Sequence, residues 1–346
     1  MGDDSSMLLA GSTDGAYRVT GLHDDGDGTV GRVLDAGRVS RVCRFEDVPG
    51  VFAATDTGLF HSTDGAAWAD LGVPTEKVYS VGVSPGGERV YAGTRPAAVY
   101  VADLSERDDD DAAAGGDGIA GDDALVARDL SWRELEGFQD LPSREEWRLP
   151  RHEDLAQVRD VHVTATDPDH VVAGVEVGGV HASANGGETW TERRDGIHDD
   201  VHELVVVADG EYVVATGFGL YRTTDAGETW TRLDDAFDQR YFRATVAVDD
   251  DVYAGANMAN TSRWEDDDAD AALFVSRNGA PLERVETPRP AETPTGFTTV
   301  DGDVVAGTHR GTLLRETATS DWTVAGSIPV PEDTIVSYTP LTWLAD

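Results

Sequence analysis

Short apolar runs recur along the chain, and they are too short to form helices. Residues 78–83, 161–163, 204–207 and 245–248 are rich in Val, and polar or glycine-containing segments separate them. Runs of this length and composition are typical of strands that are buried on both faces. A triplet of small residues follows downstream of each run. The pattern therefore predicts an all-β protein.

The small-residue triplets define a repeat. Seven occur, and they begin 39 to 52 residues apart except for one interval of 81 residues. A four-stranded propeller blade takes about 40 residues, so the triplets predict a seven-bladed β-propeller with four strands in each blade. The triplets are Ala10-Gly11-Ser12, Ala53-Ala54-Thr55, Ala92-Gly93-Thr94, Ala173-Gly174-Val175, Ala215-Thr216-Gly217, Ala254-Gly255-Ala256 and Ala306-Gly307-Thr308.

A second repeated segment ends in a tight turn and a tryptophan, and we call its copies the turn-tryptophan segments. In each copy, Asp or Asn is expected to bond its own backbone, glycine takes a positive φ, and the tryptophan packs beneath the next strand. We interpret these residues as structural, with calcium or ligand binding as the alternative. The clear copies are 62–68 with Asp64 and Trp68, 183–190 with Asn185 and Trp190, and 223–230 with Asp225 and Trp230.

The long interval between the third and fourth triplets is interpreted as an insertion in the third blade. Residues 105–127 are mostly Asp, Ala and Gly. They lack the β-branched and aromatic residues that two buried strands need. Residues 99–101 and 131–135 would then be the last two strands of that blade. A smaller insertion is predicted at 260–271, in the sixth blade.

The two ends of the chain are predicted to meet in the first blade. Residues 7–11 already have second-strand character, whereas residues 334–339 have first-strand character. A C-terminal strand would therefore join the N-terminal blade, close the ring and remove the open sheet edges. The predicted blades, within one domain spanning 1–346, are 334–346 with 7–36, 37–74, 75–138, 156–197, 200–236, 240–288 and 294–330.

The turn-tryptophan segments resemble the Asp-box or BNR repeats of sialidase-like propellers. The copies at 183–190 and 223–230 fit the pattern Ser/Thr-x-Asp/Asn-x-Gly-x-Thr-Trp, and the copy at 62–68 is one residue shorter. The group also includes xyloglucanase-like glycosidases, sortilin-type receptors and photosystem II assembly-factor propellers. The resemblance implies the propeller fold and leaves the function open, because the functions of the group are varied.

The charge of the chain narrows the range of partners. With 66 acidic and 27 basic residues, the net charge is −39. A charge of this size repels nucleic acid, so no nucleic-acid partner is expected. Arg rather than Lys carries the positive charge, since Lys77 is the single lysine. This acidic composition resembles that of proteins from extremely halophilic archaea.

The absence of certain sequence features indicates the cellular compartment of the protein. Cys43 is the single cysteine, which excludes an internal disulfide. No apolar segment has the length of a signal-peptide core or a membrane span. We therefore expect a cytoplasmic, monomeric protein with no membrane contact and no cofactor.

The candidate site lies on one face of the predicted propeller. Loops that enter the first strands and loops that follow the second strands share that face, opposite the turn-tryptophan segments. An acid at Glu176, where other units carry Arg, Phe or Asn, suggests a polar ligand or proton transfer at the channel mouth. The candidate ligand-binding residues are Arg95, Trp147, Arg148, His152, Glu176, His198, His202, Tyr241, Arg243 and His309.

A binding or scaffold propeller is the function that the sequence favours, with an unidentified protein or small polar molecule as partner. The resemblance implies a sialidase-like glycoside hydrolase as the alternative. Such a site uses three arginines, a Tyr–Glu nucleophile pair and an Asp. Tyr241 with Glu176 would imitate the pair, and the cations would come from Arg95, Arg148, Arg243 and Arg310. The Arg-Ile-Pro signature of sialidases is absent, so no catalytic residue is assigned.

A metal enzyme is the third possibility. His198 and His202, with Asp199, Asp200 and His152, offer nitrogen and oxygen ligands. A four-residue spacing aligns two histidines on a helix, however, and this segment is predicted to be a loop that enters a strand. No metal site is therefore assigned from the sequence.

The excess of acidic residues predicts that folding depends on salt. Transfer from molar salt to dilute buffer should unfold the protein, because concentrated salt screens the self-repulsion of a chain with a net charge of −39. Circular dichroism melts across a salt series measure this effect. A cooperative melt that is the same in molar and millimolar salt would show that the acidic surface needs no screening.

Overall fold

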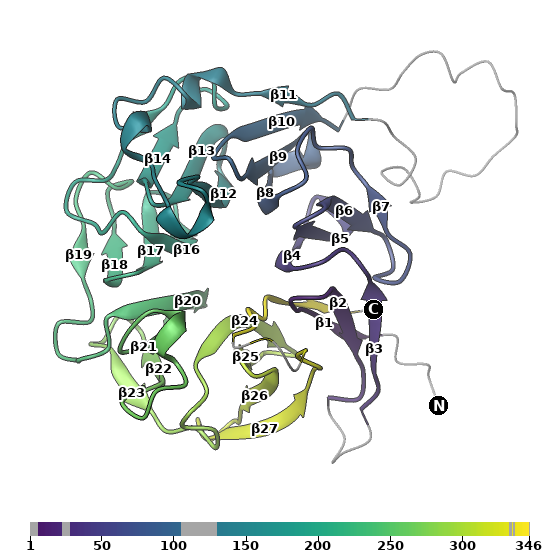
Figure 1. Cartoon of the computed structure of the whole chain (residues 1–346), viewed down its shortest axis with the longest axis vertical. Coiled ribbons are helices and arrows are strands. Elements are labelled where there is room, and N and C mark those ends of the chain that lie inside the picture. Colours follow the sequence, from purple (N-terminus) through teal and green to yellow (C-terminus); the bar gives the residue numbers. More distant parts are fainter. Residues whose placement is uncertain (1–5, 23–27, 105–129, 332–333, 335, 346) are drawn as a thin grey trace, which may run out of the picture.

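Seven antiparallel sheets of four strands each form a ring around a central channel (Figure 1). The computed structural model describes residues 6–22, 28–104, 130–331, 334 and 336–345. The predicted fold, an all-β seven-bladed propeller, is confirmed. Helical structure in the described residues is limited to segments of three residues, and none of them has the length or apolarity of a membrane span.

Each predicted blade range contains the strands of one sheet. From the channel outward, the first three blades are β28 (Leu341–Leu344), β1 (Met7–Gly11), β2 (Ala16–Val19) and β3 (Val30–Leu34); β4 (Val39–Phe45), β5 (Val48–Thr55), β6 (Gly58–Ser62) and β7 (Ala69–Asp70); and β8 (Val78–Val83), β9 (Arg89–Thr94), β10 (Val99–Asp103) and β11 (Arg133–Glu134).

The fourth to seventh blades have the same order. They are β12 (Gln157–Thr164), β13 (Asp167–Glu176), β14 (Gly179–Ser183) and β15 (Thr191–Glu192); β16 (Val201–Ala208), β17 (Glu211–Thr216), β18 (Gly219–Thr223) and β19 (Thr231–Arg232); β20 (Tyr241–Val248), β21 (Asp251–Asn257), β22 (Ala272–Ser276) and β23 (Glu283–Val285); and β24 (Pro294–Val300), β25 (Asp303–Thr308), β26 (Thr312–Glu316) and β27 (Trp322–Ser327).

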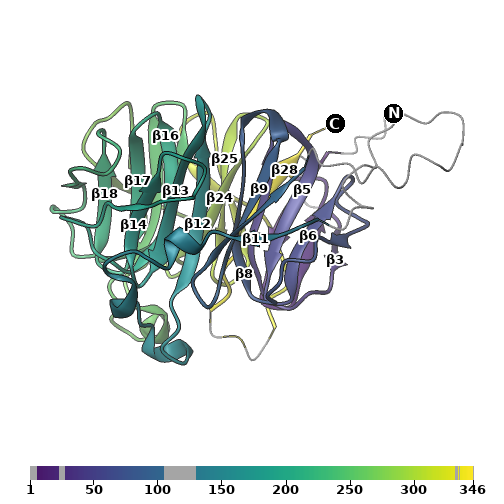
Figure 2. The same cartoon turned by 90° about the horizontal axis from the view of Figure 1, so that it is seen from above.

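In the described residues, five short 3-10 segments lie between strands. They are η1 (Pro85–Gly87), η3 (Glu136–Phe138), η4 (Arg144–Glu146), η5 (Pro150–His152) and η6 (Thr261–Arg263). Figure 2 shows the strands crossing the thickness of the disc, with short helical turns of the teal region projecting beyond the sheets on one face.

The hydrophobic core lies between neighbouring blades. Every residue of β8 is buried, as predicted for an innermost strand. One core cluster joins Val213 of the fifth blade to Phe242 and Phe274 of the sixth, and the two phenylalanine ring centroids lie 5.7 Å apart. Each blade thus buries its apolar faces against the blades beside it, so a single blade has no complete core of its own.

The ring is closed by the C-terminal segment, as predicted, but the closing strand lies further along the chain. β28 pairs with β1, with Leu344 opposite Met7 and Leu341 opposite Ala10. The prediction of a strand at 334–339 was wrong, because described residues of that segment bond to the seventh blade instead. The Thr339 amide donates to Thr295 Oγ1 at 3.1 Å, and the Thr339 hydroxyl donates to the seventh blade's β25.

Consecutive blades approach each other closely at glycines of the small-residue triplets. A Cβ on Gly93 would lie 2.6 Å from Val158 Cγ1 of the next blade, and one on Gly255 would lie 2.1 Å from the carbonyl oxygen of Pro294. A Cβ on Gly174 would lie 2.8 Å from Val201 Cγ1 of the following blade. These distances are too short for a real Cβ, so the repeat of small residues is a steric requirement of the ring.

The two predicted insertions differ in what can be described. β10 pairs with β11, with Val101 opposite Arg133, so residues 99–101 and 131–135 contribute to one blade as expected. The acidic insertion at 105–127 lies outside the described residues. In the sixth blade, the insertion at 260–271 contains η6, and its Trp264 is buried against Tyr241 and His309.

Gly255→Ala tests the close approach between blades. The substitution should lower the free energy of unfolding by about 1–3 kcal/mol, because the new methyl group would overlap the backbone of the next blade. Equilibrium denaturant unfolding measures the change. Gly31→Ala is the matched control, since a Cβ there meets no atom within 4 Å. Equal effects of the two substitutions would contradict the steric explanation.

Candidate functional site

The innermost strands share an irregularity that turns one side chain of each into the channel. In six blades, the pairing between the first and second strands skips one residue near the start of the inner strand. A bulge of this kind re-aims the side chain of the extra residue. The skipped residues are Ser40, Tyr79, Arg159, His202, Arg243 and Thr295.

Two cavities lie along the channel. The inner cavity is narrow, about 40 Å³, and five of the six skipped residues line it. The outer cavity, about 480 Å³, lies where the inner strands begin. Its described lining residues are Thr13, Arg38, Tyr79, Arg151, His152, Gln157, Arg159, Glu176, Thr261, Ser262, Thr334, Val336 and Tyr338.

Arginines surround the ring of Tyr338, which lines both cavities. The guanidinium carbon of Arg243 lies 3.8 Å from the ring centroid, that of Arg159 at 5.9 Å and that of Arg38 at 6.0 Å. The guanidinium carbon of Arg159 also lies 5.6 Å from the centroid of the Tyr79 ring. Because a cation is attracted to the face of an aromatic ring, the tyrosines hold several like charges close together.

The positive charges of this cluster are only partly balanced. Glu176 is the single carboxylate among the described residues that line the outer cavity, and its Oε2 lies 3.6 Å from Arg159 Nε. Within the described chain, Arg38 and Arg243 have no carboxylate oxygen within 4.0 Å, and the Nε of Arg38 is buried without a hydrogen-bond partner. Burial, followed by the charge of Arg159, lowers the pKa of Arg243.

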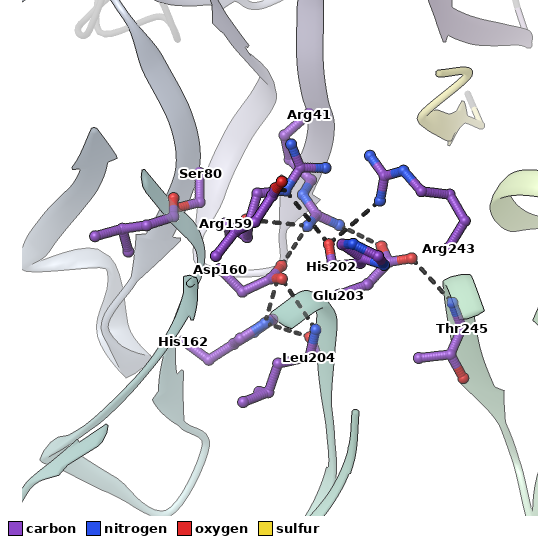
Figure 3. Close-up of polar contacts among 12 residues, drawn as sticks. Arg41, Ser80, Arg159, Asp160, His162, His202, Glu203, Leu204, Arg243 and Thr245 are labelled. Atoms are coloured by element: carbon purple, nitrogen blue, oxygen red, sulfur yellow. Dashed lines mark hydrogen bonds and ion pairs between the residues drawn. The ribbon is translucent and has the colours of Figure 1, made fainter. Parts of the chain in front are cut away.

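Further along the channel, acids and arginine are fully paired (Figure 3). Arg41 donates to Glu203 Oε1 at 2.6 Å and also to Asp160, whose side chain is 2% exposed. Asp160 and Glu203 each accept a further backbone N–H, from Leu204 and Thr245. This network joins the second, fourth, fifth and sixth blades, so it serves to hold the ring together.

A second polar cluster lies beside the outer cavity. Carboxylate oxygens of Glu176 and Asp200 and a ring nitrogen of His202 lie within 4.8 Å of one another. Gln157 Nε2 donates to Glu176 Oε2 at 2.6 Å. Burial raises the pKa of Asp200, but His202, His198 and Arg151 together outweigh it and hold the value at about 2. The ring of Tyr241 packs on His202, with centroids 4.5 Å apart, and burial raises its pKa.

The structure brings five of the predicted site residues to the two cavities and their rim. Glu176 and His152 line the outer cavity, and His202 and Arg243 line the inner one. Arg95 lines a neighbouring depression together with His152. Burial, followed by the charge of Arg95, lowers the pKa of His152.

The remaining predicted residues lie elsewhere. Trp147 is a core residue, because its ring packs against Phe138 and its Nε1 donates to Ser143 Oγ at 2.9 Å. His309 is also buried, and Trp264 covers it. Tyr241 is buried behind His202. Two predicted residues, Arg148 and His198, line neither cavity, and Arg148 is exposed.

Sequence reasoning missed the residues that contribute most to the outer cavity. Arg38, Tyr79, Arg159 and Tyr338 were not selected, because the sequence pattern places each of them in a strand or just before one. A signal was present in the repeat itself. Arg159 and Arg243 are each the third residue of an innermost strand, where a charged side chain is unexpected.

The turn-tryptophan segments have the hydrogen bonds that their sequence predicts. Asp64 Oδ1 accepts the Ala66 amide at 2.8 Å, and Asn185 Oδ1 and Asp225 Oδ1 each accept the amide of a Thr at 2.9 Å. The side chains of Thr229 and Thr223, followed by the Thr229 amide, hold the pKa of Asp225 at about 2. Trp230 Nε1 donates to a backbone carbonyl of the fourth blade. Trp68 packs against the core between the first two blades, and Trp190 packs on Phe138.

Comparison with known proteins places the chain by its fold. No protein-family model matches it, and no curated protein sequence does. A GH74 xyloglucanase from Xanthomonas campestris is 13% identical, with a TM-score of 0.63 over 94% of this chain and 53% of the enzyme. The WD40 propeller domain of Doa1 is 12% identical, with a TM-score of 0.56 over 86% and 84% of the two chains.

A structure of YCF48 bound to D1 peptide is also similar. It is 13% identical, with a TM-score of 0.50 over 86% of this chain and 83% of that one. This chain spans about half the length of the xyloglucanase. The neighbours therefore include both enzymes and binding propellers, and at these identities they share the fold alone.

Arg41→Met tests whether the paired network stabilises the ring. The substitution should lower the free energy of unfolding by about 3–5 kcal/mol, because it leaves Asp160 and Glu203 buried without their cation. Denaturant titration measures the change. The triple variant Arg41→Met, Asp160→Asn, Glu203→Gln removes those charges as well and should recover most of the loss. A single variant as stable as the wild type would contradict this role.

Proposed function

We propose that the protein is a binding propeller without catalytic activity, and that its outer cavity holds an acidic group of a protein or small-molecule partner. The cavity supplies hydrogen-bond donors from arginines and flat apolar faces from Tyr79 and Tyr338. Arginine suits this task, because its planar fork matches the geometry of carboxylate and phosphate groups.

The observation that carries the proposal is the local excess of positive charge. The chain as a whole has a net charge of −39, yet the described lining of the outer cavity contains Arg38, Arg151 and Arg159 against Glu176 alone. Arg243 adds a further buried cation beneath Tyr338. Unpaired cations in a concave, partly dehydrated site attract an anion more strongly than the same charges do on an open surface.

The chemistry of the partner follows from this lining. An acidic side chain, a terminal carboxylate or an acidic sugar would satisfy the arginines and stack against a tyrosine. The fold neighbour YCF48, which has been observed bound to D1 peptide, supports a peptide as one form of such a partner. Residues of η5 and η6 form part of the rim, so the partner would contact loops of the fourth and sixth blades.

A glycoside hydrolase is the second candidate, and one observation favours it. Oxygens of Glu176 and Asp200 lie within 4.8 Å of each other, similar to the separation of about 5–5.5 Å between the two carboxyl groups of retaining glycosidases. Asp200, however, does not line the outer cavity, and Glu176 Oε2 accepts from Gln157. Among the hydrogen bonds of the described residues, none joins Glu176 to Tyr241 or His152.

Paired probes that differ by one acidic group test the binding proposal. N-acetylneuraminic acid and its methyl ester form one pair, and a tetrapeptide with a free terminal carboxylate and its amide form another. The acidic member should raise the melting temperature of the wild type and the neutral member should not. Arg38→Gln should abolish the shift. The lowest salt that keeps the protein folded is required, because salt screens the attraction.

Arg148→Gln is the matched control for this experiment. It removes the same charge from an exposed position that lines neither cavity, so the response to the acidic probe should persist. Equal responses to the acidic and neutral probes, or equal losses in the two variants, would refute the proposal. Hydrolysis of a xyloglucan oligosaccharide or a sialoside by the wild type, absent in Glu176→Gln, would favour the enzyme instead.

A further inference from the structure

Three potential metal ligands converge from different parts of the chain beside the outer cavity. Glu176 ends β13, Asp200 precedes β16, and His202 is the bulge residue of β16. One ligand atom of each lies within 4.8 Å of the others. The sequence did not predict this set, because Glu176 is 24 residues before Asp200 and belongs to another blade.

The orientation of His202 provides an independent indication of a ligand. Its side chain is 2% exposed, and its Nδ1 lies 2.6 Å from the carbonyl oxygen of Phe242. A carbonyl can only accept, so Nδ1 carries the proton and donates it. The other nitrogen, Nε2, then presents a lone pair, yet it is buried with no hydrogen-bond partner. A backbone carbonyl that fixes the tautomer in this way is a usual feature of metal-binding histidines.

The carboxylates of Asp200 and Glu176 complete the set of possible metal ligands. Asp200 Oδ1 is also buried without a hydrogen bond, and it lies 3.6 Å from His202 Nε2. Glu176 Oε2 is occupied by Gln157 and faces Arg159, but no described residue donates a hydrogen bond to its second oxygen. His202 Nε2 and Asp200 Oδ1, both without a hydrogen-bond partner, therefore face each other at a distance longer than a hydrogen bond. A carboxylate oxygen of Glu176 lies near both.

We propose that Glu176, Asp200 and His202 bind one divalent transition-metal ion, with Zn²⁺ as the best match. One imidazole and two carboxylates are ligands that Zn²⁺ accepts, and three protein ligands leave a coordination position open. Glu176 lines the outer cavity and His202 lines the inner one, so the site adjoins both and has a route of entry. The open position would bind water or an acidic group of a partner.

Nearby arginines are the main factor that opposes metal binding at this cluster. Arg159 lies 3.6 Å from Glu176, and Arg151 and Arg243 are close enough to interact electrostatically with the same carboxylate. The alternative to a metal is a protonated His202 that pairs directly with Asp200. That pair would also explain why the two side chains lie close together, so the experiment must separate the two explanations.

Calorimetric titration of the chelator-treated full chain with ZnCl₂ provides the test. The wild type should bind one Zn²⁺ per chain at a site distinct from the weak binding of surface acids. Asp200→Asn should weaken that site by about 100-fold or more, beyond the effect of losing a group that only supports a ligand. Asp199→Asn is the matched control, because it makes the same change at the adjacent, half-exposed residue. It should leave the affinity unchanged.

Visible spectroscopy with Co²⁺ in place of Zn²⁺ gives a second readout, applied to variants whose circular dichroism spectrum matches that of the wild type. Wild type and Asp199→Asn should show the absorption of a low-coordinate Co²⁺ site, and Asp200→Asn and Glu176→Gln should not. A wild type that binds Zn²⁺ only weakly and at many sites, or equal affinities for the Asp199 and Asp200 variants, would overturn the proposal and leave the His202–Asp200 ion pair as the explanation. Neither readout uses the acidic probes, so the metal site and the anion cavity can fail separately.

Discussion

The close approach between each blade's second strand and the next blade's innermost strand is the constraint on which the rest of the structure depends. At Gly93, Gly174 and Gly255 the backbone of one blade leaves no room for a Cβ beside the next. The inner strand bulges opposite these small residues: Ser80, Asp160 and Ala244 pair with them after one residue has been skipped. Tight packing of the ring and the orientation of side chains into the channel therefore have the same origin, since in six blades both follow from small residues that face one extra residue of the inner strand.

This constraint explains how much of the structure could be predicted from the sequence. The small residues are visible as a repeat, so the number of blades followed from their spacing, and the closure of the ring followed from the strand character of the two chain ends. The fifth triplet shows what the spacing of small residues cannot predict. Its Ala215, rather than the central Thr216, lies opposite the bulge, an offset that spacing alone does not reveal. The closing strand was misplaced for a related reason. Residues around Tyr338 have strand-like composition, but they bond to the seventh blade before the chain enters β28.

The candidate site was predicted less completely, because exposure and function were inferred from loops. His152 in a loop and Glu176 at the end of β13 do line the outer cavity. Arg159, however, was not predicted, because it lies within a strand and reaches the channel only because of the bulge, as the predicted Arg243 does in the sixth blade. Trp147 illustrates the opposite error. An aromatic residue in a long connection resembled a ligand contact, but Trp147 packs with Phe138 and with His181 of β14 in the core between the third and fourth blades. A hydrophobic residue in a long loop can therefore belong to the core and does not by itself indicate a site.

The anion cavity and the metal cluster share Glu176, and this shared carboxylate has a thermodynamic consequence. Glu176 is the single acid among the described residues that line the cavity, and it lies beside Arg159. A metal ion on Glu176 would take up part of its negative charge, so Arg159 would interact more strongly with an incoming acidic group. Binding of the acidic group would, in turn, remove Arg159 as a competitor for the carboxylate. Linkage requires the two effects to be equal in free energy, so the sites would strengthen each other by the same factor in both directions. An acidic protein would in this way use one buried carboxylate to make the affinity of its basic cavity depend on a metal ion.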